Sequence, residues 1–259
     1  MRVAIAGKGG VGKTTISATL CRLAARSGRP VLAIDGDSNP NLATALGVDG
    51  ASDHEPFLPA ALVSYRAGGP ALSKPVDDVI DDYASIGRDG VRLVRMGAPQ
   101  HADEGCLCSA HATVSAVLGE LRSRAELLTV LDLEASPEHL SRGTARHADV
   151  LLLVTEPYYR SLETIRRLAV LARELAIPRI AVVANKVRSS LDETGLREFC
   201  DRDDLECIAF VPWSDAVIDA DGRGGRVLDD APGDPAVLAI AALTERLLTS
   251  SPLAPQGLR

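Results

Sequence analysis

The run GKGGVGKTT, from Gly7 to Thr15, carries more chemical information than any other stretch of the chain. It fits the phosphate-binding pattern G-x-x-x-x-G-K-[ST], and it places a second lysine, Lys8, directly after the first glycine. Glycines let backbone N–H groups curl around a phosphate, and a following helix adds unpaired amides and the positive end of its dipole. The loop is therefore predicted to bind a nucleotide.

The side chains of this loop have separate expected tasks. Lys13 is placed to reach the β- and γ-phosphates, and the Thr14 hydroxyl can take one site on Mg²⁺, which otherwise prefers phosphate oxygens and water. We expect the contacts to ATP to come from Gly9, Gly10, Val11, Gly12, Lys13, Thr14 and Thr15. The alternative is a glycine-rich turn that binds nothing.

Acidic residues follow two other apolar runs. Asp35 and Asp37 are separated by one residue at the end of such a run, so they can orient an attacking water and hold the shell of Mg²⁺. Asp37 is the better candidate for the water and for a water-mediated contact to Mg²⁺. Asp132 ends another apolar run and is expected to contact Mg²⁺ through a water, as the acid of a Walker B strand does. The alternative is that Asp35 and Asp37 only cap turns.

The elements that must position these residues alternate between strands and helices. Val3 to Ala6 suits a buried parallel strand, and the chain turns helical from Thr14, with Ile16 and Leu20 on one face. Further short buried strands are expected at Val31–Asp35, Val91–Arg95, Leu127–Asp132, Val150–Thr155, Ile180–Asn185 and Cys207–Val211. This alternation predicts an α/β fold with a single doubly wound, mostly parallel sheet flanked by helices. Ligands of such folds collect at the carboxyl ends of the strands.

The 259 residues are expected to form one main unit. We assign 1–248 to a P-loop ATPase domain and 249–259 to a flexible tail. Residues 49–89 form an insertion-like segment with a short amphipathic helix, and we interpret its acidic residues, Asp77, Asp78, Asp81 and Asp82, as its solvated face rather than a metal site. Residues 101–122 form a separate cysteine-containing segment.

Charge and hydropathy exclude several classes of protein. The net charge of −7 and the lack of any Lys/Arg-rich block argue against a nucleic-acid partner. No charged segment precedes an apolar signal region, and no apolar stretch approaches about 18 residues, so we expect neither export nor a membrane span. The expected location is cytoplasmic.

Two of the five cysteines are close in sequence. Cys106 and Cys108 precede a helix with an apolar stripe, and a helix N-terminus lowers the pKa of a thiol, which favours binding of soft or borderline metals. Two sulfurs leave Zn²⁺ or Ni²⁺ under-coordinated, but a two-fold axis doubles them to four. His111 could complete a site, although we interpret it as a surface histidine. The other three cysteines are expected to be inert core thiols: Cys21, Cys200 and Cys207.

The glycine-rich loop resembles the deviant Walker A loop of the MinD/ParA, nitrogenase iron protein and arsenical-pump ATPases. This resemblance implies that Lys8 contacts phosphate across a homodimer, so that hydrolysis is coupled to association. A cation supplied by a partner stabilises the charge of phosphoryl transfer only when two subunits close. Lys8, Lys13 and Asp37 are therefore the expected catalytic residues.

Within that class the chain is similar to the CooC-type maturation ATPases of nickel carbon monoxide dehydrogenase. The stretches that carry the similarity are the loop, Ala33–Leu46, Glu104–Cys108, Leu131–Ala145 and, more weakly, Val211–Asp221. It implies an ATP-dependent homodimeric metallochaperone with a client such as nickel carbon monoxide dehydrogenase. It also implies that Cys106 and Cys108 of both subunits hold Ni²⁺ or Zn²⁺ at the dimer interface.

The same resemblance places a contact to the adenine base at Asn185. The donor and acceptor of its amide suit an adenine edge. Pro212 and Trp213 follow the last strand and could wall the base, although Trp213 is equally compatible with a core or interface aromatic.

Two features depart from the family pattern. Ser136 and Pro137 stand where a glycine is expected, and Ser38 and Asn39 replace the expected Pro-Asp. A stiffer loop at residues 136–137 could alter how the γ-phosphate is sensed.

Two other functions stay open as alternatives. An iron–sulfur electron donor resembling nitrogenase iron protein would hold a [4Fe–4S] cluster with four dimer thiolates. That family has a second cysteine after the second switch, and Glu134–His139 contains none. A positioning ATPase of the MinD/ParA kind needs a membrane-binding helix or a basic DNA surface, and Leu247–Arg259 offers neither.

Overall fold

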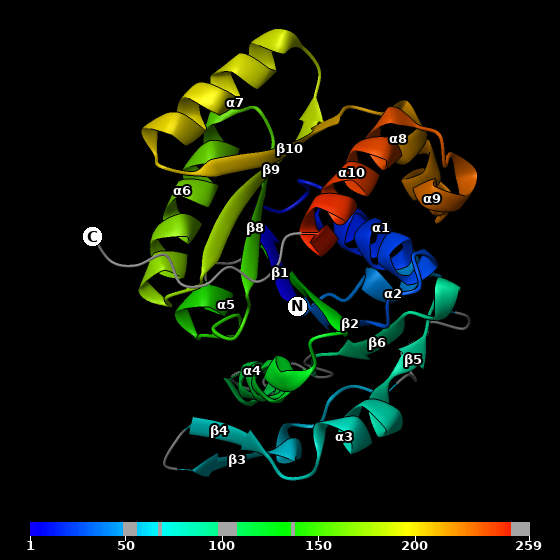
Figure 1. Cartoon of the computed structure of the whole chain (residues 1–259), viewed down its shortest axis with the longest axis vertical. Helices are drawn as coiled ribbons and strands as arrows, with labels where there is room; N and C mark the ends of the chain where they lie inside the picture. The colour runs from blue at the N-terminus through cyan, green and yellow to red at the C-terminus, as the bar shows by residue number, and fades with distance from the viewer. Residues whose placement is uncertain (49–55, 67–68, 98–107, 136–137, 250–259) are drawn as a thin grey trace.

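An eight-stranded sheet forms the centre of the molecule in the computed structural model, which describes residues 1–48, 56–66, 69–97, 108–135 and 138–249 (Figure 1). The strand order is β10-β9-β8-β1-β7-β2-β6-β5, and every neighbouring pair is parallel except β5 and β6. The strands are β1 Arg2–Gly7, β2 Val31–Gly36, β5 Ser85–Ile86, β6 Arg92–Arg95, β7 Leu128–Leu133, β8 Val150–Thr155, β9 Arg179–Val187 and β10 Glu206–Pro212. The predicted fold class is confirmed.

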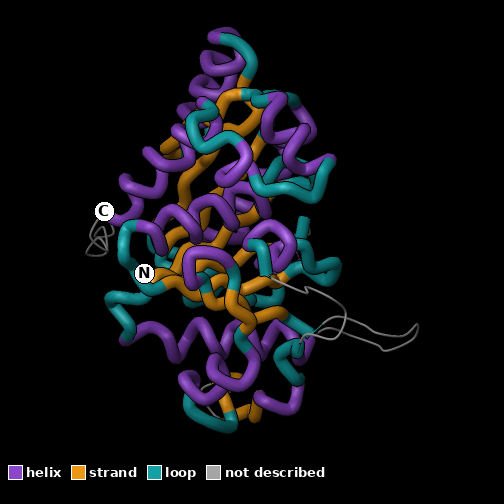
Figure 2. Tube along the Cα trace, turned by 90° about the vertical axis from the view of Figure 1, so that its right-hand side faces the viewer, coloured by secondary structure: helices purple, strands orange, loops and turns teal. Residues whose placement is uncertain are grey.

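Helices cover both faces of this sheet, and the strands run through the interior between them (Figure 2). The helices are α1 Lys13–Arg26, α2 Leu42–Leu46, α3 Val76–Tyr83, α4 Cys108–Glu120, α5 Glu138–Ser141, α6 Tyr159–Glu174, α7 Ser190–Arg202, α8 Asp215–Gly222, α9 Val227–Asp230 and α10 Pro235–Thr249. Three short 3₁₀ helices are η1 Ala60–Leu62, η2 Arg88–Gly90 and η3 Leu121–Ser123.

The alternation of side chains along β1 explains the two layers. Val3 and Ile5 belong to a core cluster shared with α1 and α10, whereas Ala4 and Ala6 belong to a second cluster shared with α4 and α6. Because successive side chains of a strand point to opposite faces, a strand that is buried on both faces is a continuous apolar run. The predicted strands therefore lie within two residues of the observed ones.

The segment 49–89 contains more structure than its sequence predicts. The expected amphipathic helix is present as α3, with Val76, Val79 and Ile80 buried. Three strands were not predicted: β3 Val63–Arg66 and β4 Gly69–Leu72 form an antiparallel hairpin, and β5 joins the edge of the main sheet. The predicted tail lies outside the described residues from position 250 onward.

The parallel arrangement brings the polar strand ends together. β1 lies between β7 and β8, and Asp35 of β2 is in register with Asp132 of β7. Gly7 and Asn185 end or nearly end β1 and β9 at the same edge of the sheet. Gly7, Asp35, Asp132 and Asn185 therefore all lie at the carboxyl edge of the sheet, where ligands of such folds bind.

Candidate functional site

The loop between β1 and α1 needs glycine at two of its positions. A Cβ at Gly7 would clash with the carbonyl oxygen of Val154, and a Cβ at Gly12 would clash with the amide of Asn185. Gly12 also has a φ of 91°, in the left-handed region that favours glycine. The loop can therefore pass close under the ends of β8 and β9 and begin α1 at Lys13.

Lys13 lies inside this loop and is only 7% exposed. Its Nζ donates to the carbonyl oxygen of Lys8 at 3.3 Å. Burial lowers the pKa of Lys13, while the carboxylates of Asp132, Asp37 and Glu134 act in the opposite direction. The ammonium thus faces a group of acids at the carboxyl edge of the sheet.

Asp132 is buried beside the start of α1. One of its carboxylate oxygens accepts from the Ser17 hydroxyl at 3.1 Å, and the Thr14 side chain also hydrogen-bonds to it. Burial and the nearby Asp35 charge raise the pKa of Asp132 to about 7. Thr14 and Asp132, predicted separately from the sequence, therefore lie next to each other.

Asp35 and Asp37 have different surroundings. The buried carboxylate of Asp35 accepts from the backbone N–H groups of Asp37 at 3.1 Å and Leu42 at 2.9 Å. Burial raises the pKa of Asp35 to about 6. Asp37 is half-buried, accepts from the backbone N–H of Asn39 at 2.8 Å, and lies near Lys13. Asp35 thus shapes the turn after β2, and Asp37 is the acid of the pair that faces the phosphate loop.

Two consecutive residues of β9 donate hydrogen bonds to carbonyl oxygens of the phosphate loop. The Asn185 amide donates to the carbonyl oxygen of Val11 at 2.7 Å, and Lys186 Nζ donates to the carbonyl oxygen of Gly10 at 2.7 Å. Lys186 also forms an ion pair of 2.8 Å with Glu156, which follows β8. Lys186 and Glu156 were not predicted as site residues, although Lys186 directly follows Asn185 at the end of a predicted strand.

The residues expected to wall the adenine base lie at the end of β10. Trp213 donates its backbone N–H to the carbonyl oxygen of Val187 at 2.8 Å and its indole N–H to Asp215 at 2.9 Å. The Arg188 guanidinium lies 3.7 Å from the centre of the Trp213 ring, in a cation–π contact. One face of the indole is thus covered by arginine, and Pro212 precedes it at the last position of β10.

Lys8 points away from the interior of its own loop. Its Nζ lies 3.4 Å from the hydroxyl of Tyr158 and 5.0 Å from the centre of that ring. Tyr158 is 38% exposed and directly precedes α6. Lys8 therefore lies against an exposed aromatic residue of the same subunit.

A cleft of about 220 Å³ adjoins the phosphate loop between α1, α2 and the α8–α9 segment. Thr14 and Thr15 line one wall, and Val217 and Arg226 line the other. Asn185, Pro212 and Trp213 do not line this cleft.

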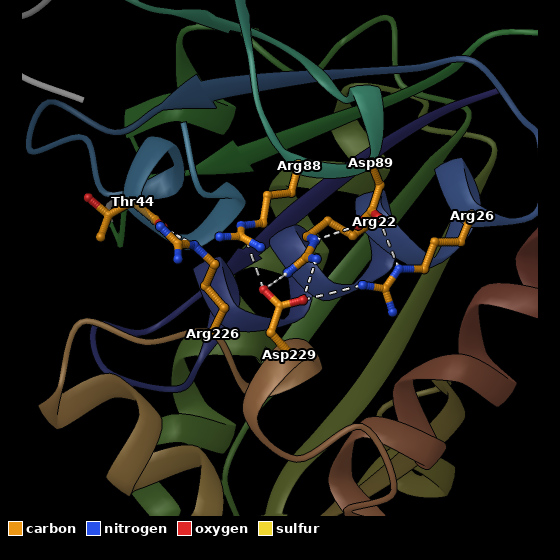
Figure 3. Close-up of polar contacts among 7 residues, drawn as sticks. All are labelled: Arg22, Arg26, Thr44, Arg88, Asp89, Arg226 and Asp229. Atoms are coloured by element: carbon orange, nitrogen blue, oxygen red, sulfur yellow. Dashed lines mark hydrogen bonds and ion pairs between the residues drawn. The ribbon is translucent and has the colours of Figure 1, made fainter. Parts of the chain in front are cut away.

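An ion-pair network joins the walls of the cleft (Figure 3). The Arg22 side chain of α1 is 2% exposed and contacts Asp89 at 2.7 Å and Asp229 at 2.6 Å. Arg26, one turn along α1, reaches the same two carboxylates at 3.1 and 3.3 Å but is 41% exposed. The network ties η2 and α9 to the helix that begins at the phosphate loop.

Arg22→Ala is expected to lower the free energy of unfolding by about 3 kcal/mol, because it leaves two partly buried carboxylates without their buried cation. Arg26→Ala is the matched control, since it removes a mostly exposed partner of the same acids and should cost less than about 1 kcal/mol. Urea denaturation followed by circular dichroism measures both. Equal losses in the two variants would contradict the assigned role of Arg22.

The cysteine segment is described only from Cys108, the first residue of α4, and Cys106 lies outside the described residues. Arg142 Nη1 donates to the sulfur of Cys108 at 2.7 Å. Cys108 is disulfide-bonded in the structure, so the form that could bind a metal is the reduced one. Within the described ranges, no group of three or more His, Cys, Asp or Glu side chains could hold a metal ion.

The interpretation of His111 as a surface residue was wrong. His111 is 4% exposed, because the residues after α5 cover the first turns of α4. Its Nδ1 shares a hydrogen bond of 3.1 Å with the Thr144 hydroxyl, and its ring meets the His139 ring edge-on at 4.4 Å.

The three remaining cysteines are free thiols, and Cys21 and Cys200 are buried as expected. Burial raises the pKa of Cys21. A hydrogen bond between Cys200 and Cys207 raises the pKa of the first and lowers that of the second, and Cys207 is only half-buried. Cys207 is therefore less sheltered than the sequence predicted.

Comparison with known proteins identifies the family. Residues 3–227 match the model of the CobQ/CobB/MinD/ParA nucleotide binding domain. The chain belongs to this family. It is 36% identical, over 95% of its length and 97% of the relative, to the carbon monoxide dehydrogenase accessory protein CooC of Rhodospirillum rubrum. It is 35% identical, over 86% of its length and 90% of the relative, to an uncharacterised ATP-binding protein of Methanocaldococcus jannaschii. The resemblance stated from the sequence is thus confirmed.

Solved structures of the CobQ/CobB/MinD/ParA family support the fold. The septum site-determining protein MinD of Pyrococcus horikoshii, complexed with Mg-ADP, superposes with a TM-score of 0.74 at 20% identity and covers 96% of this chain and 97% of its own. Family membership and the ATP-binding relatives support a nucleotide-hydrolysing P-loop ATPase. None of the helices in the described part of the chain is long and apolar enough to cross a membrane.

Proposed function

We propose that the chain is an ATP-dependent metallochaperone that works as a homodimer. ATP-driven closure brings together Cys106 and Cys108 of two subunits, and the four thiolates hold Ni²⁺ or Zn²⁺ for a carbon monoxide dehydrogenase-type client in the cytoplasm. The observation that carries the proposal is the sequence Cys106-Leu107-Cys108, whose last residue begins α4, in a chain that is 36% identical to CooC over 95% of its length. The choice of client follows from the name of that relative.

Three side chains have proposed roles in hydrolysis. Lys13, inside its loop, stabilises charge on the transferred phosphoryl group, and Asp37 orients the attacking water. Lys8 reaches the nucleotide of the partner subunit. It lies 3.4 Å from the Tyr158 hydroxyl in the single subunit, so closure requires Lys8 to leave this contact.

The donors at the carboxyl edge of the sheet fit Mg²⁺. Thr14, Asp37 and Asp132 supply oxygen atoms, which this hard cation prefers, and Thr14 is already hydrogen-bonded to Asp132. We propose that Thr14 binds the ion directly and that the two aspartates contact it through water. When bound, Mg²⁺ neutralises charge between the β- and γ-phosphates.

Cys108→Ser is expected to weaken Zn²⁺ and Ni²⁺ binding by at least about 100-fold, because it removes two of the four thiolates of the dimer. The experiment uses reduced full-length protein kept anaerobically, with and without Mg-ATP, and measures affinity by competition with a chromophoric chelator. Cys207→Ser is the matched control, since Cys207 is a free thiol far along the chain on β10.

Unchanged metal binding in Cys108→Ser would refute the metallochaperone proposal. A strong visible sulfur-to-iron absorption band in protein purified anaerobically would instead favour the iron–sulfur alternative.

A further inference from the structure

Polar side chains connect the turn after β2 with the strand end of β7. The Ser38 hydroxyl donates to Glu134 Oε2 at 3.0 Å, and His139 Nε2 lies 3.4 Å from the same oxygen. Burial alone would raise the pKa of Glu134, but the hydrogen bonds from Ser38 and His139 lower it. Glu134 is also close enough to Lys13 to affect its pKa. One carboxylate thus joins the Ser38 turn, the phosphate-loop lysine and a buried histidine.

The chain of contacts continues from His139 into α4. His139 is 1% exposed and His111 is 4% exposed, and their rings are 4.4 Å apart at an angle of 89°. The Thr144 hydroxyl shares a hydrogen bond of 3.1 Å with His111 Nδ1. Burying an imidazole is costly unless its nitrogen atoms are paired, and Glu134 and Thr144 each pair one nitrogen of these two rings.

The residues that follow α5 contact one face of α4 at three levels. Arg142 donates to the Cys108 sulfur at 2.7 Å, Thr144 bonds His111, and the Ser115 hydroxyl donates to the carbonyl oxygen of Gly143 at 3.3 Å. Positions 108, 111 and 115 are spaced by three and four residues, so they lie along one face of the helix. Movement of residues 138–144 would therefore be transmitted to the end of α4 that bears Cys108.

We propose that Glu134, His139 and His111 form a positioning relay that couples the nucleotide at the phosphate loop to the Cys108 end of α4. Ser38 lies next to Asp37, the acid proposed to orient the attacking water, so displacement of this turn changes the contact between Ser38 and Glu134. The displacement is then transmitted through His139 to His111, because the two rings are buried in contact with each other and a close-packed core cannot absorb the movement. The relay rests on the proposed function in that Cys108 is taken as a metal ligand.

The relay is tested with a readout that a merely structural histidine would not change. Alkylation of Cys108 by iodoacetamide, followed by peptide mass spectrometry, reports the exposure and reactivity of this sulfur without any metal. Reduced full-length protein is compared in Mg-ADP and in Mg-ATPγS. The measured quantity is the ratio of the two alkylation rates.

The wild-type ratio is expected to differ from one by at least about fivefold, and His139→Gln is expected to bring it close to one. His147→Gln is the matched control, because His147 packs beside Gly119 at the other end of α4, and it should keep the wild-type ratio. Fluorescent-nucleotide titration and thermal denaturation confirm that each variant binds nucleotide and folds. Ser38→Ala, at the half-buried end of the relay, should lower the ratio to below about twofold without altering the core.

A wild-type ratio near one, or a His139→Gln ratio equal to that of the wild type, would overturn the relay. If His139→Gln does not fold, an unchanged ratio in Ser38→Ala would overturn it equally. The metallochaperone proposal fails on a different result, namely unchanged metal binding in Cys108→Ser. The two failures can be distinguished because the alkylation ratio is measured without metal.

Discussion

Lys8→Ala is expected to slow ATP hydrolysis by about 10³-fold while leaving the affinity for nucleotide within about threefold of wild type. The reason is the direction of the side chain. In the single subunit the Lys8 ammonium lies against Tyr158, and Lys13 alone occupies the interior of the loop. Removal of the Lys8 side chain should therefore leave nucleotide binding intact and abolish the stabilisation of phosphoryl-transfer charge that we propose Lys8 provides to the partner subunit.

The measurements are steady-state phosphate release, fluorescent-nucleotide binding and multi-angle light scattering with Mg-ATPγS. Lys8→Ala should remain monomeric where the wild type forms dimers. Tyr158→Phe is the control, because it keeps the ring beneath the Lys8 ammonium and removes only the hydroxyl. A wild-type protein that stays monomeric in every nucleotide state would refute both the dimer and the assigned role of Lys8.

The main sheet could be predicted from the sequence because its strands are buried on both faces. β8 was predicted with its observed bounds, Val150–Thr155, and the six other parallel strands within two residues, whereas the short edge strand β5 was not predicted. The hairpin of β3 and β4 could not be predicted in the same way. Its strands are four residues long and lie in a Gly- and Pro-containing segment, where neither alternation nor a continuous apolar run is long enough to be recognised.

Site residues could be predicted where neighbouring residues in the sequence determine their position. They could not be predicted where contacts with distant segments determine their burial. The glycine-rich loop can be recognised from its contiguous sequence pattern alone. The expected parallel sheet places the ends of β2 and β7 at one edge, and Asp35 and Asp132 are in register there. His111 was misplaced because its cover comes from Thr144 and His139, about 30 residues further along the chain. Helical spacing predicts which face of α4 is apolar, but it contains no information on which segment packs over the other face.

Asp37→Asn is expected to lower the rate of ATP hydrolysis by about 10³-fold with little change in stability. Asp37 is half-buried and lies near Lys13, so its carboxylate is placed to orient water at the phosphate. The amide retains an oxygen that can accept from the backbone N–H of Asn39 but loses the negative charge. Single-turnover hydrolysis and thermal denaturation measure the two properties independently.

Asp35→Asn is the matched variant, and it should show the opposite balance. Both carboxylate oxygens of Asp35 accept hydrogen bonds from backbone N–H groups. In the asparagine variant an NH₂ group replaces one of these oxygens and faces a donor, which should lower the free energy of unfolding by about 2 kcal/mol. If Asp37→Asn instead lost stability and kept its hydrolysis rate, Asp37 would be a turn cap like Asp35. The two aspartates are two residues apart, but β2 carries the first into the core, and the chain leaves the sheet before the second. This difference in depth is why we expect Asp35 to shape the turn and propose Asp37 for the chemistry.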